Sequence, residues 1–313
     1  MSESHLTRPP AEHATATVAM RGKPGIRLIG VASGLGAQDA GCGRGPWTVK
    51  HSHWSHRLAE ATEWSDLIYP RAGLEHWAAL ADLAGRVGDE VARTLAAGRF
   101  PVVIGGDHSC ALGTWSGVRR ALAARPEAGF GLLWIDAHMD SHIPATSASH
   151  AAHGMPLAAL LGHGHHALIS LAGGRPVLQP QHVCLLATRS YEEEEAALLN
   201  RLGVRVITQA EVLARGLPAC LTEALARVGE AAAGFGISLD LDAIDPIEAP
   251  GVGSPEPAGL AARALIAALA PVLDDHRLLA LEIAEFNPQH DREQRTRHVL
   301  IDLLERLAKA RCG

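Results

Sequence analysis

Two short segments of the chain carry carboxylates and imidazoles at the spacing of metal ligands. The first reads Asp136-Ala-His138-Met-Asp140, and the second, Ser-Leu-Asp240-Leu-Asp242, ends a separate apolar run. Residues two apart on a strand point to the same face, so each segment can present its ligands together. Several buried like charges need cations, and carboxylate oxygens mixed with imidazole suit Mn, Fe, Co, Ni or Zn. The two segments therefore predict a site for divalent metal ions.

Polar groups follow two further apolar runs. Gly-Gly-Asp-His108-Ser comes after residues 101–104, and Glu285 comes after residues 278–283. A pair of divalent ions held by such groups can share one water and turn it into a hydroxide near neutral pH. Glu285 is a candidate acceptor for a guanidinium or amidinium group, because a carboxylate matches two parallel N–H groups. His153 is a candidate for carrying protons to a leaving amine.

Each of these motifs has a simpler structural interpretation when it is taken alone. The segments 105–109 and 240–246 are compatible with ordinary turns, Glu285 with a helix-capping or salt-bridged acid, and His153 with a loop histidine. In open α/β sheets, however, ligands collect at the carboxyl ends of the strands. The occurrence of all these motifs at separate strand ends favours a metal site.

Composition restricts the class of protein. The 313 residues are 47% hydrophobic, enough for one large α/β domain or two modest ones. With 28 basic and 34 acidic residues and no long basic run, nucleic acid and membrane are poor candidates as partners, and a small molecule is favoured. The five cysteines are an odd number without a CxxC pair, which favours a reducing cytoplasm. We expect a flexible N-terminal arm at 1–24, without a signal peptide, and a single catalytic domain at 25–313.

Apolar runs of strand length alternate with stretches of helical periodicity. Seven strands are predicted, at 26–31, 101–104, 131–135, 182–187, 204–207, 235–241 and 278–283. Helices are predicted between and after them, at 74–97, 111–124, 192–202, 210–232, 260–273 and 292–308. Because the strand runs are continuously apolar, both faces of the sheet should be covered. This pattern predicts an α/β fold with a mostly parallel sheet and helices on each side.

Three further motifs have weaker functional interpretations. The His-rich segment 162–166 is expected to be an exposed loop, and the acids at 192–195 a solvated helix N-terminus favoured by the helix dipole. Residues 30–36 lack the GxGxxG spacing, so we expect no nicotinamide cofactor. Ser109 and Cys110 next to a histidine lack a third group that would make either a nucleophile.

Taken together, the motifs resemble the ureohydrolases, the family of arginase, agmatinase and related guanidino or formimino hydrolases. The resemblance spans most of the chain and rests on motifs in the family's order: GGDHS at 105–109, DAHxD at 136–140, His-Gly at 153–154, SxDxDxxDP at 238–246, a turn at 251–256 and ExNP at 285–288. It implies a three-layer α/β/α arginase-like fold with a mostly parallel eight-stranded sheet. It also implies two metal ions per chain, usually Mn²⁺ although Co, Ni, Fe or Zn would also fit these ligands, and a homo-trimer or hexamer.

The resemblance also implies a role for individual residues. The six metal ligands would be His108 and Asp140 on one ion, His138 and Asp242 on the other, and Asp136 and Asp240 bridging both. His153 would transfer protons and Glu285 would bind the guanidinium, while Asp107 and Asp245 would orient ligands. A metal-bridging hydroxide would attack the guanidinium carbon, and the tetrahedral intermediate would release an amine and urea. No organic cofactor is needed.

Local features are similar to the arginase branch of the family, which makes L-arginine the leading substrate. Counterparts of the groups that hold the arginine tail fall on His142, Ser149 and Glu192. Two expected asparagines are replaced, one by His142 and one by Ala151. The alternatives are another substrate, such as agmatine, guanidinobutyrate or formiminoglutamate, and a non-catalytic metal-binding homologue. A deacetylase-like hydrolase with one zinc ion would share the fold.

Overall fold

The central feature of the molecule is one eight-stranded sheet. The computed structural model of the chain describes residues 25–53, 58, 61–125 and 128–312, so the predicted N-terminal arm at 1–24 lies outside the described residues. The strand order is β2-β1-β3-β8-β7-β4-β5-β6, and every neighbouring pair is parallel. The strands are β1 Ile26–Gly30, β2 Thr62–Trp64, β3 Phe100–Ile104, β4 Gly131–Ile135, β5 Val183–Thr188, β6 Arg205–Thr208, β7 Phe235–Asp240 and β8 Leu278–Ala284. The predicted parallel sheet is confirmed.

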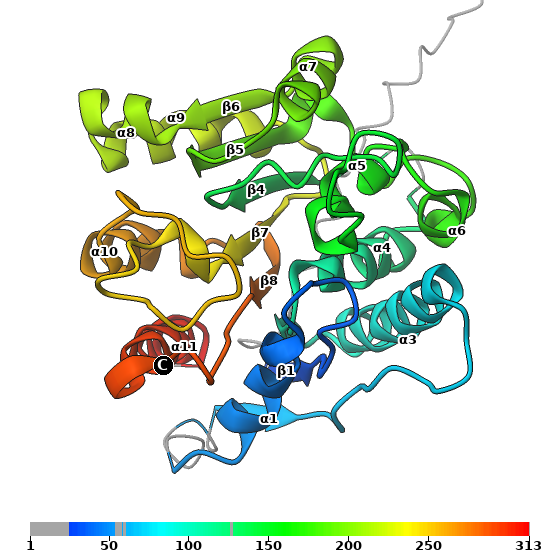
Figure 1. Ribbon diagram of the computed structural model, residues 1–313. Helices are drawn as coiled ribbons and strands as arrows, with labels where there is room; N and C mark the ends of the chain where they lie inside the picture. Colours follow the sequence, from blue (N-terminus) through cyan, green and yellow to red (C-terminus); the bar gives the residue numbers. More distant parts are fainter. Residues whose placement is uncertain (1–24, 54–57, 59–60, 126–127, 313) are drawn as a thin grey trace, which may run out of the picture.

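Helices cover both faces of this sheet (Figure 1). One layer contains α3 His76–Ala96, α4 Ala111–Ala121, α5 Pro156–Leu160 and α6 His166–Ile169, and the other contains α8 Gln209–Arg215, α9 Leu217–Val228, α10 Ala262–Leu273 and α11 Arg295–Cys312. The remaining α-helices of the described residues are α1 Gly45–Lys50 and α7 Glu193–Leu202. This arrangement confirms the three-layer α/β/α fold. Within the described residues, every helix is too short or too polar to cross a membrane.

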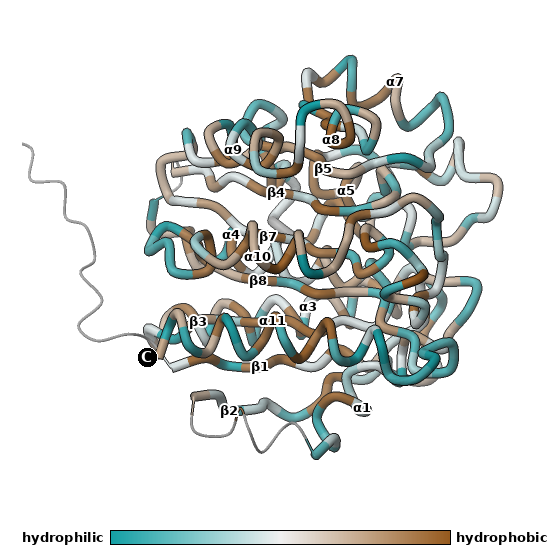
Figure 2. The backbone as a smooth tube through the Cα atoms, turned by 90° about the vertical axis from the view of Figure 1, so that its left-hand side faces the viewer, coloured by the Kyte–Doolittle hydropathy of each residue, from teal (hydrophilic) through white to brown (hydrophobic). Residues whose placement is uncertain are grey.

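The continuous apolar runs are explained by two hydrophobic cores, one on each face of the sheet. In β4, Leu133 and Ile135 belong to the core shared with α9 and α10, whereas Leu132 and Trp134 belong to the core shared with α3 and α4. Alternate residues of a strand point to opposite faces, so a strand buried on both faces must be apolar throughout. Figure 2 shows the hydrophobic strands stacked between the helices in the order of the sheet.

The short helices α1, α5 and α6 were not predicted, and two further differences have a clear physical cause. The strand β2 was not predicted, because a three-residue edge strand carries too little alternation to be recognised. The single helix predicted at 210–232 is wrong: α8 and α9 are separated at Gly216, whose φ of +84° and ψ of 141° are open mainly to glycine. The helical spacing of apolar residues continues across Gly216, so the sequence pattern does not indicate the break.

The sheet order explains why distant motifs meet. Strands β3, β8, β7 and β4 are consecutive neighbours, and because they are parallel their carboxyl ends lie at the same edge. The loops that leave these four ends contain residues 105–109, 285–288, 241–245 and 136–140. All four motif-bearing segments therefore converge on one edge of the sheet.

Candidate metal centre

The ring of His108 faces three carboxylates at one buried point. Its Nδ1 lies 3.2 Å from Asp136 Oδ2, 3.0 Å from Asp140 Oδ2 and 3.0 Å from Asp240 Oδ2. All four side chains are buried, yet Nδ1 makes no hydrogen bond of acceptable geometry. Nitrogen and oxygen donor atoms that surround one point in this way fit a divalent cation.

The other ring nitrogen of His108 determines which tautomer is present. Nε2 lies 2.9 Å from Ser238 Oγ, and Ser238 in turn donates to Glu282 Oε1 at 2.9 Å. Since the serine hydroxyl donates to Glu282, its oxygen accepts a hydrogen bond from the Nε2–H group of His108. When the ring of His108 is neutral, as a metal ligand must be, its lone pair is therefore on Nδ1, the atom that faces the carboxylates.

The short 3₁₀ helix η2 (His108–Cys110) is held at its first turn by Asp107. The Asp107 carboxylate accepts hydrogen bonds from Ser109 N at 2.9 Å and from Gly36 N at 3.0 Å. The predicted orienting function of Asp107 is consistent with these contacts. Asp245 instead accepts from the backbone N–H groups of Ile247 and Gly259, so it stabilises the turn that follows the ligand segment.

A second group of donors lies around His138 and shares Asp136 with the first. His138 Nδ1 is 3.0 Å from Asp242 Oδ2 and 3.6 Å from Asp136 Oδ1. Among the described residues, three groups of side chains have donor atoms that could hold an ion, and Asp136 belongs to two of them. The structure thus brings together all six residues predicted from the sequence as metal ligands.

Charge at this centre favours a bound cation. Burial and the charge of Asp136 raise the pKa of Asp140 to about 6. Burial, with the charges of Asp242 and Asp136, raises the pKa of Asp240 well above its usual range. Four buried carboxylates face two imidazoles here, so a cation between them would lower the free energy of the ionised acids.

Glu285 and His153 form a pair beside this centre. His153 Nδ1 lies 3.0 Å from Glu285 Oε1, which also accepts from the backbone N–H of His108 at 2.9 Å. Burial would lower the pKa of His153, but the hydrogen bond and charge of Glu285 outweigh it and raise that pKa to about 9. Glu285 has a φ of +66°, a left-handed conformation that costs a non-glycine residue about 1 kcal/mol. Backbone strain of this kind is concentrated at functional sites.

Comparison with known proteins identifies the family. The model of the Arginase family matches residues 24–309. The chain belongs to the arginase family. It is 34% identical to the arginase of Bacillus caldovelox over 292 residues, covering 89% of this chain and 96% of that protein. The crystal structure of arginase from Bacillus subtilis superposes with a TM-score of 0.83 at 31% identity, covering 91% of this chain and 98% of that one.

A solved structure of lower sequence identity supports the fold alone. The formimidoylglutamase of Bacillus subtilis has a TM-score of 0.75 at 21% identity, with 93% of this chain and 88% of that chain covered. The predicted ureohydrolase family, its hydrolase class and its α/β/α fold are therefore confirmed for this chain.

Two of the predicted substrate-binding residues of this arginase-family chain contact each other. His142 Nε2 lies 2.9 Å from Glu192 Oε2 and 3.4 Å from Glu195 Oε2. Glu192 and Glu195 also form the capping box at the start of α7. The predicted solvated helix end is wrong for Glu195, whose side chain is only 4% exposed and whose pKa burial raises to about 8. Ser149 lies on the same loop as His142 and accepts from the backbone N–H of Ala151.

Several residues that support the centre were missed by sequence reasoning. Trp134 donates from Nε1 to Asp136 Oδ2 at 2.8 Å. Arg189 donates to the backbone carbonyls of Asp242 and Glu256 at 2.7 and 2.8 Å and thereby ties together the two ends of the ligand-bearing turn. Trp134 precedes Asp136 by two residues on an alternating strand, and this spacing could have revealed it. Arg189 has no comparable local signal.

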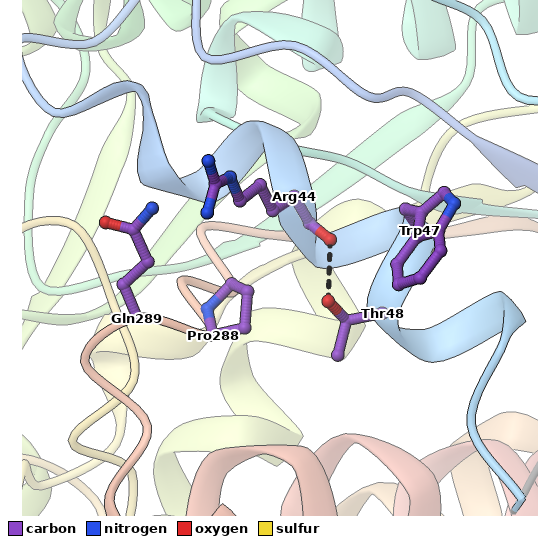
Figure 3. Close-up of a pocket in the computed structure, with 5 residues that line it drawn as sticks. All are labelled: Arg44, Trp47, Thr48, Pro288 and Gln289. Atoms are coloured by element: carbon purple, nitrogen blue, oxygen red, sulfur yellow. Dashed lines mark hydrogen bonds between the residues drawn. The ribbon is translucent and has the colours of Figure 1, made fainter.

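Two other features lie apart from the centre. His165 of the segment 162–166 stacks on Trp77 at 4.5 Å and caps α6, and no residue of this segment is in a group of metal donors among the described residues. A pocket lies between the α1 region and the loop after β8, and Figure 3 shows the residues that line it. Its volume is about 470 Å³. It is lined by residues other than the predicted site residues: Arg44, Trp47, Thr48, Pro288 and Gln289.

Proposed function

We propose that this chain is a binuclear manganese hydrolase that converts L-arginine and water to L-ornithine and urea, and that residues 25–313 form its catalytic domain. The observation that carries the proposal is the buried group of carboxylates and imidazoles directly beside the pair Glu285 and His153. His108 and Asp140 would hold one ion, His138 and Asp242 the other, and Asp136 and Asp240 both. The membership of Asp136 in two donor groups supports its bridging role.

Separate residues of the chain would bind the substrate and transfer the proton. Two divalent ions, when bound, would supply a water that is acidic enough to act as a nucleophile at neutral pH. Glu285 would accept the N–H groups of the guanidinium and hold its carbon in place. His153, 3.0 Å from that carboxylate, would deliver a proton to the leaving amine. The burial of Glu285 excludes water that would compete for its oxygens.

The choice of arginine is supported by the relatives named arginase, which match almost the whole chain. A second candidate is a ureohydrolase for another guanidino or formimino compound. The contact between His142 and Glu192 favours it, because a histidine tied to a carboxylate presents a different surface to the substrate tail than a free amide does.

The test is urea release across a panel of substrates, with metal content measured on the same sample. The panel contains arginine, agmatine, guanidinobutyrate and guanidine, with product formation from formiminoglutamate followed separately. Arginine should give the highest kcat/KM in protein loaded with Mn²⁺. A higher kcat/KM for another compound would replace arginine with that substrate.

Two variants test the centre itself. Asp136→Asn and Asp240→Asn each remove a bridging carboxylate and should abolish both paired metal binding and turnover. Two bound ions without product from any compound would contradict the hydrolase and favour a non-catalytic homologue. One ion per wild-type chain would contradict the binuclear centre.

A further inference from the structure

The thiol of Cys42 is placed directly on the carboxylate of Glu285. Cys42 is fully buried, and its Sγ donates to Glu285 Oε2 at 3.0 Å and lies 3.6 Å from the carbonyl oxygen of the same residue. Burial, together with the charge of Glu285, raises the pKa of this thiol well above its usual range. The thiol therefore keeps its proton and acts as a hydrogen-bond donor.

The two oxygens of Glu285 have different partners. Oε1 accepts from the backbone N–H of His108 and faces His153, whereas Oε2 accepts from the Cys42 thiol. A carboxylate that binds a planar guanidinium through both oxygens must lie in the plane of the guanidinium group. Contacts at both oxygens restrain the rotation of the carboxylate more than contacts at one, and Cys42 supplies the contact at Oε2.

Close packing keeps the thiol in this position. The segment of η1 (Ala40–Arg44) that contains Cys42 lies against the segment after β8, where a side chain at Gly45 would come within 2.4 Å of the Phe286 carbonyl oxygen. A side chain at Gly253 would come within 2.6 Å of Glu285 Oε2 and 3.2 Å of Cys42 Sγ. The backbone thus packs closely around the thiol, and a water has little room to replace it.

We propose that Cys42 is a positioning residue that donates its S–H proton to Glu285 Oε2 and holds this carboxylate in the orientation that receives a guanidinium group. The inference rests on the proposed role of Glu285. Cys42 does not touch the substrate in this scheme, and its effect is on how tightly the guanidinium binds.

The experiment compares two substitutions at one position. Cys42→Ser keeps a donor, whereas Cys42→Val has nearly the same shape without one. Cys184→Val is the matched control, because Cys184 is also a fully buried thiol but contacts a backbone carbonyl in β5. Each protein is loaded with Mn²⁺, its metal content and melting temperature are measured, and guanidinium chloride is titrated calorimetrically at constant ionic strength.

Cys42→Val should raise the Kd for guanidinium and the KM for the substrate about tenfold, as expected for the loss of one hydrogen bond to a charged group. The value of kcat should change less than KM. Cys42→Ser and Cys184→Val should bind guanidinium as the wild type does, and metal content should be equal in all four proteins. If Cys42 had only a structural role, the substitutions would lower the melting temperature, and the Kd for guanidinium would not differ between the serine and valine variants.

Two results would overturn the inference: guanidinium binding unchanged in Cys42→Val, or equally weakened in Cys42→Ser. If the wild type fails to bind guanidinium, the role of Glu285 and the inference both fail. If the binding series follows the expectation but no compound releases product, the proposed function fails while the role of Cys42 in guanidinium binding stands.

Discussion

The indole of Trp134 links a metal-ligand candidate to the core of the sheet. Its Nε1 donates to Asp136 Oδ2, and its ring stacks on His108 with centroids 4.3 Å apart. Trp134→Phe would keep an aromatic ring but remove the donor, and hydrogen-bonding partners of ligands typically contribute 10- to 100-fold in metal affinity. We expect Mn²⁺ affinity, measured by calorimetry, to fall roughly tenfold or more.

Trp115→Phe is the control for this prediction. Trp115 is equally buried, but its Nε1 has no hydrogen-bond partner among the described residues. This substitution should lower stability through lost packing and leave metal affinity unchanged. An equal loss of metal affinity in both variants would mean that Trp134 acts through packing alone.

His153 is expected to make the stability of the metal-free protein depend on pH. Its pKa of about 9 exceeds its ordinary value near 6.5, so its pairing with Glu285 stabilises the fold fully below about pH 6.5 and no longer above about pH 9. His153→Asn should therefore lower the free energy of unfolding by at most roughly 3 kcal/mol at pH 6, and by much less at pH 10. Denaturation with urea at the two pH values measures this.

The exposed His276 offers a control for the pH experiment. Its side chain is 87% exposed, and His276→Asn should leave the free energy of unfolding nearly unchanged at both pH values. A destabilisation by His153→Asn that grows with rising pH would contradict the pairing with Glu285.

At the scale of secondary structure, one glycine divides what the sequence presents as one helix. Gly216, between α8 and α9, has a φ of +84° that side chains rarely adopt. Gly216→Ala should lower the free energy of unfolding by about 1 to 3 kcal/mol, measured by chemical denaturation. The cause is backbone strain, since the nearest atom to an added Cβ would be 3.9 Å away.

A glycine inside a helix should show the opposite sign. Gly85 lies within α3, and an added Cβ there would meet nothing within 4 Å. Gly85→Ala should raise the free energy of unfolding by roughly 0.5 to 1 kcal/mol, because alanine has the higher helix propensity. If both substitutions changed stability in the same direction, backbone conformation would not be the deciding factor.

At the scale of the whole molecule, the metal centre joins loops from four neighbouring strands. The donors lie at or directly after the carboxyl ends of β3, β4 and β7, and Glu285 follows β8. Ions that bind the folded state alone raise its stability, by about 2.7 kcal/mol when their concentration is a hundred times Kd. Removal of metal by a chelator should therefore lower the melting temperature in calorimetry, and Mn²⁺ should restore it.

The bridging variant provides the control for metal removal. Asp136→Asn should melt at nearly the same temperature with and without added Mn²⁺, because it lacks a ligand of both groups. A wild-type melting temperature that does not respond to metal would contradict the proposed centre.

The order of motifs and the apolar runs were sufficient to predict most of the architecture. Seven of the eight strands and the six clustered acids and histidines follow from local patterns, because alternation and strand-end position are properties of short segments. Local patterns did not predict the edge strand β2, because it is too short. They did not predict the break at Gly216 either, because the helical period of apolar residues continues through it.

The sequence alone therefore determined the chemical groups, their separate strand ends and the family they resemble. Only the tertiary structure decided which atoms meet: the lone pair of His108 on Nδ1, the contact of His142 with Glu192, and the thiol of Cys42 on Glu285, 243 positions away. These contacts arise where loops from different strands pack against one another. Such packing depends on the whole fold, so it cannot be predicted from any short segment of the sequence.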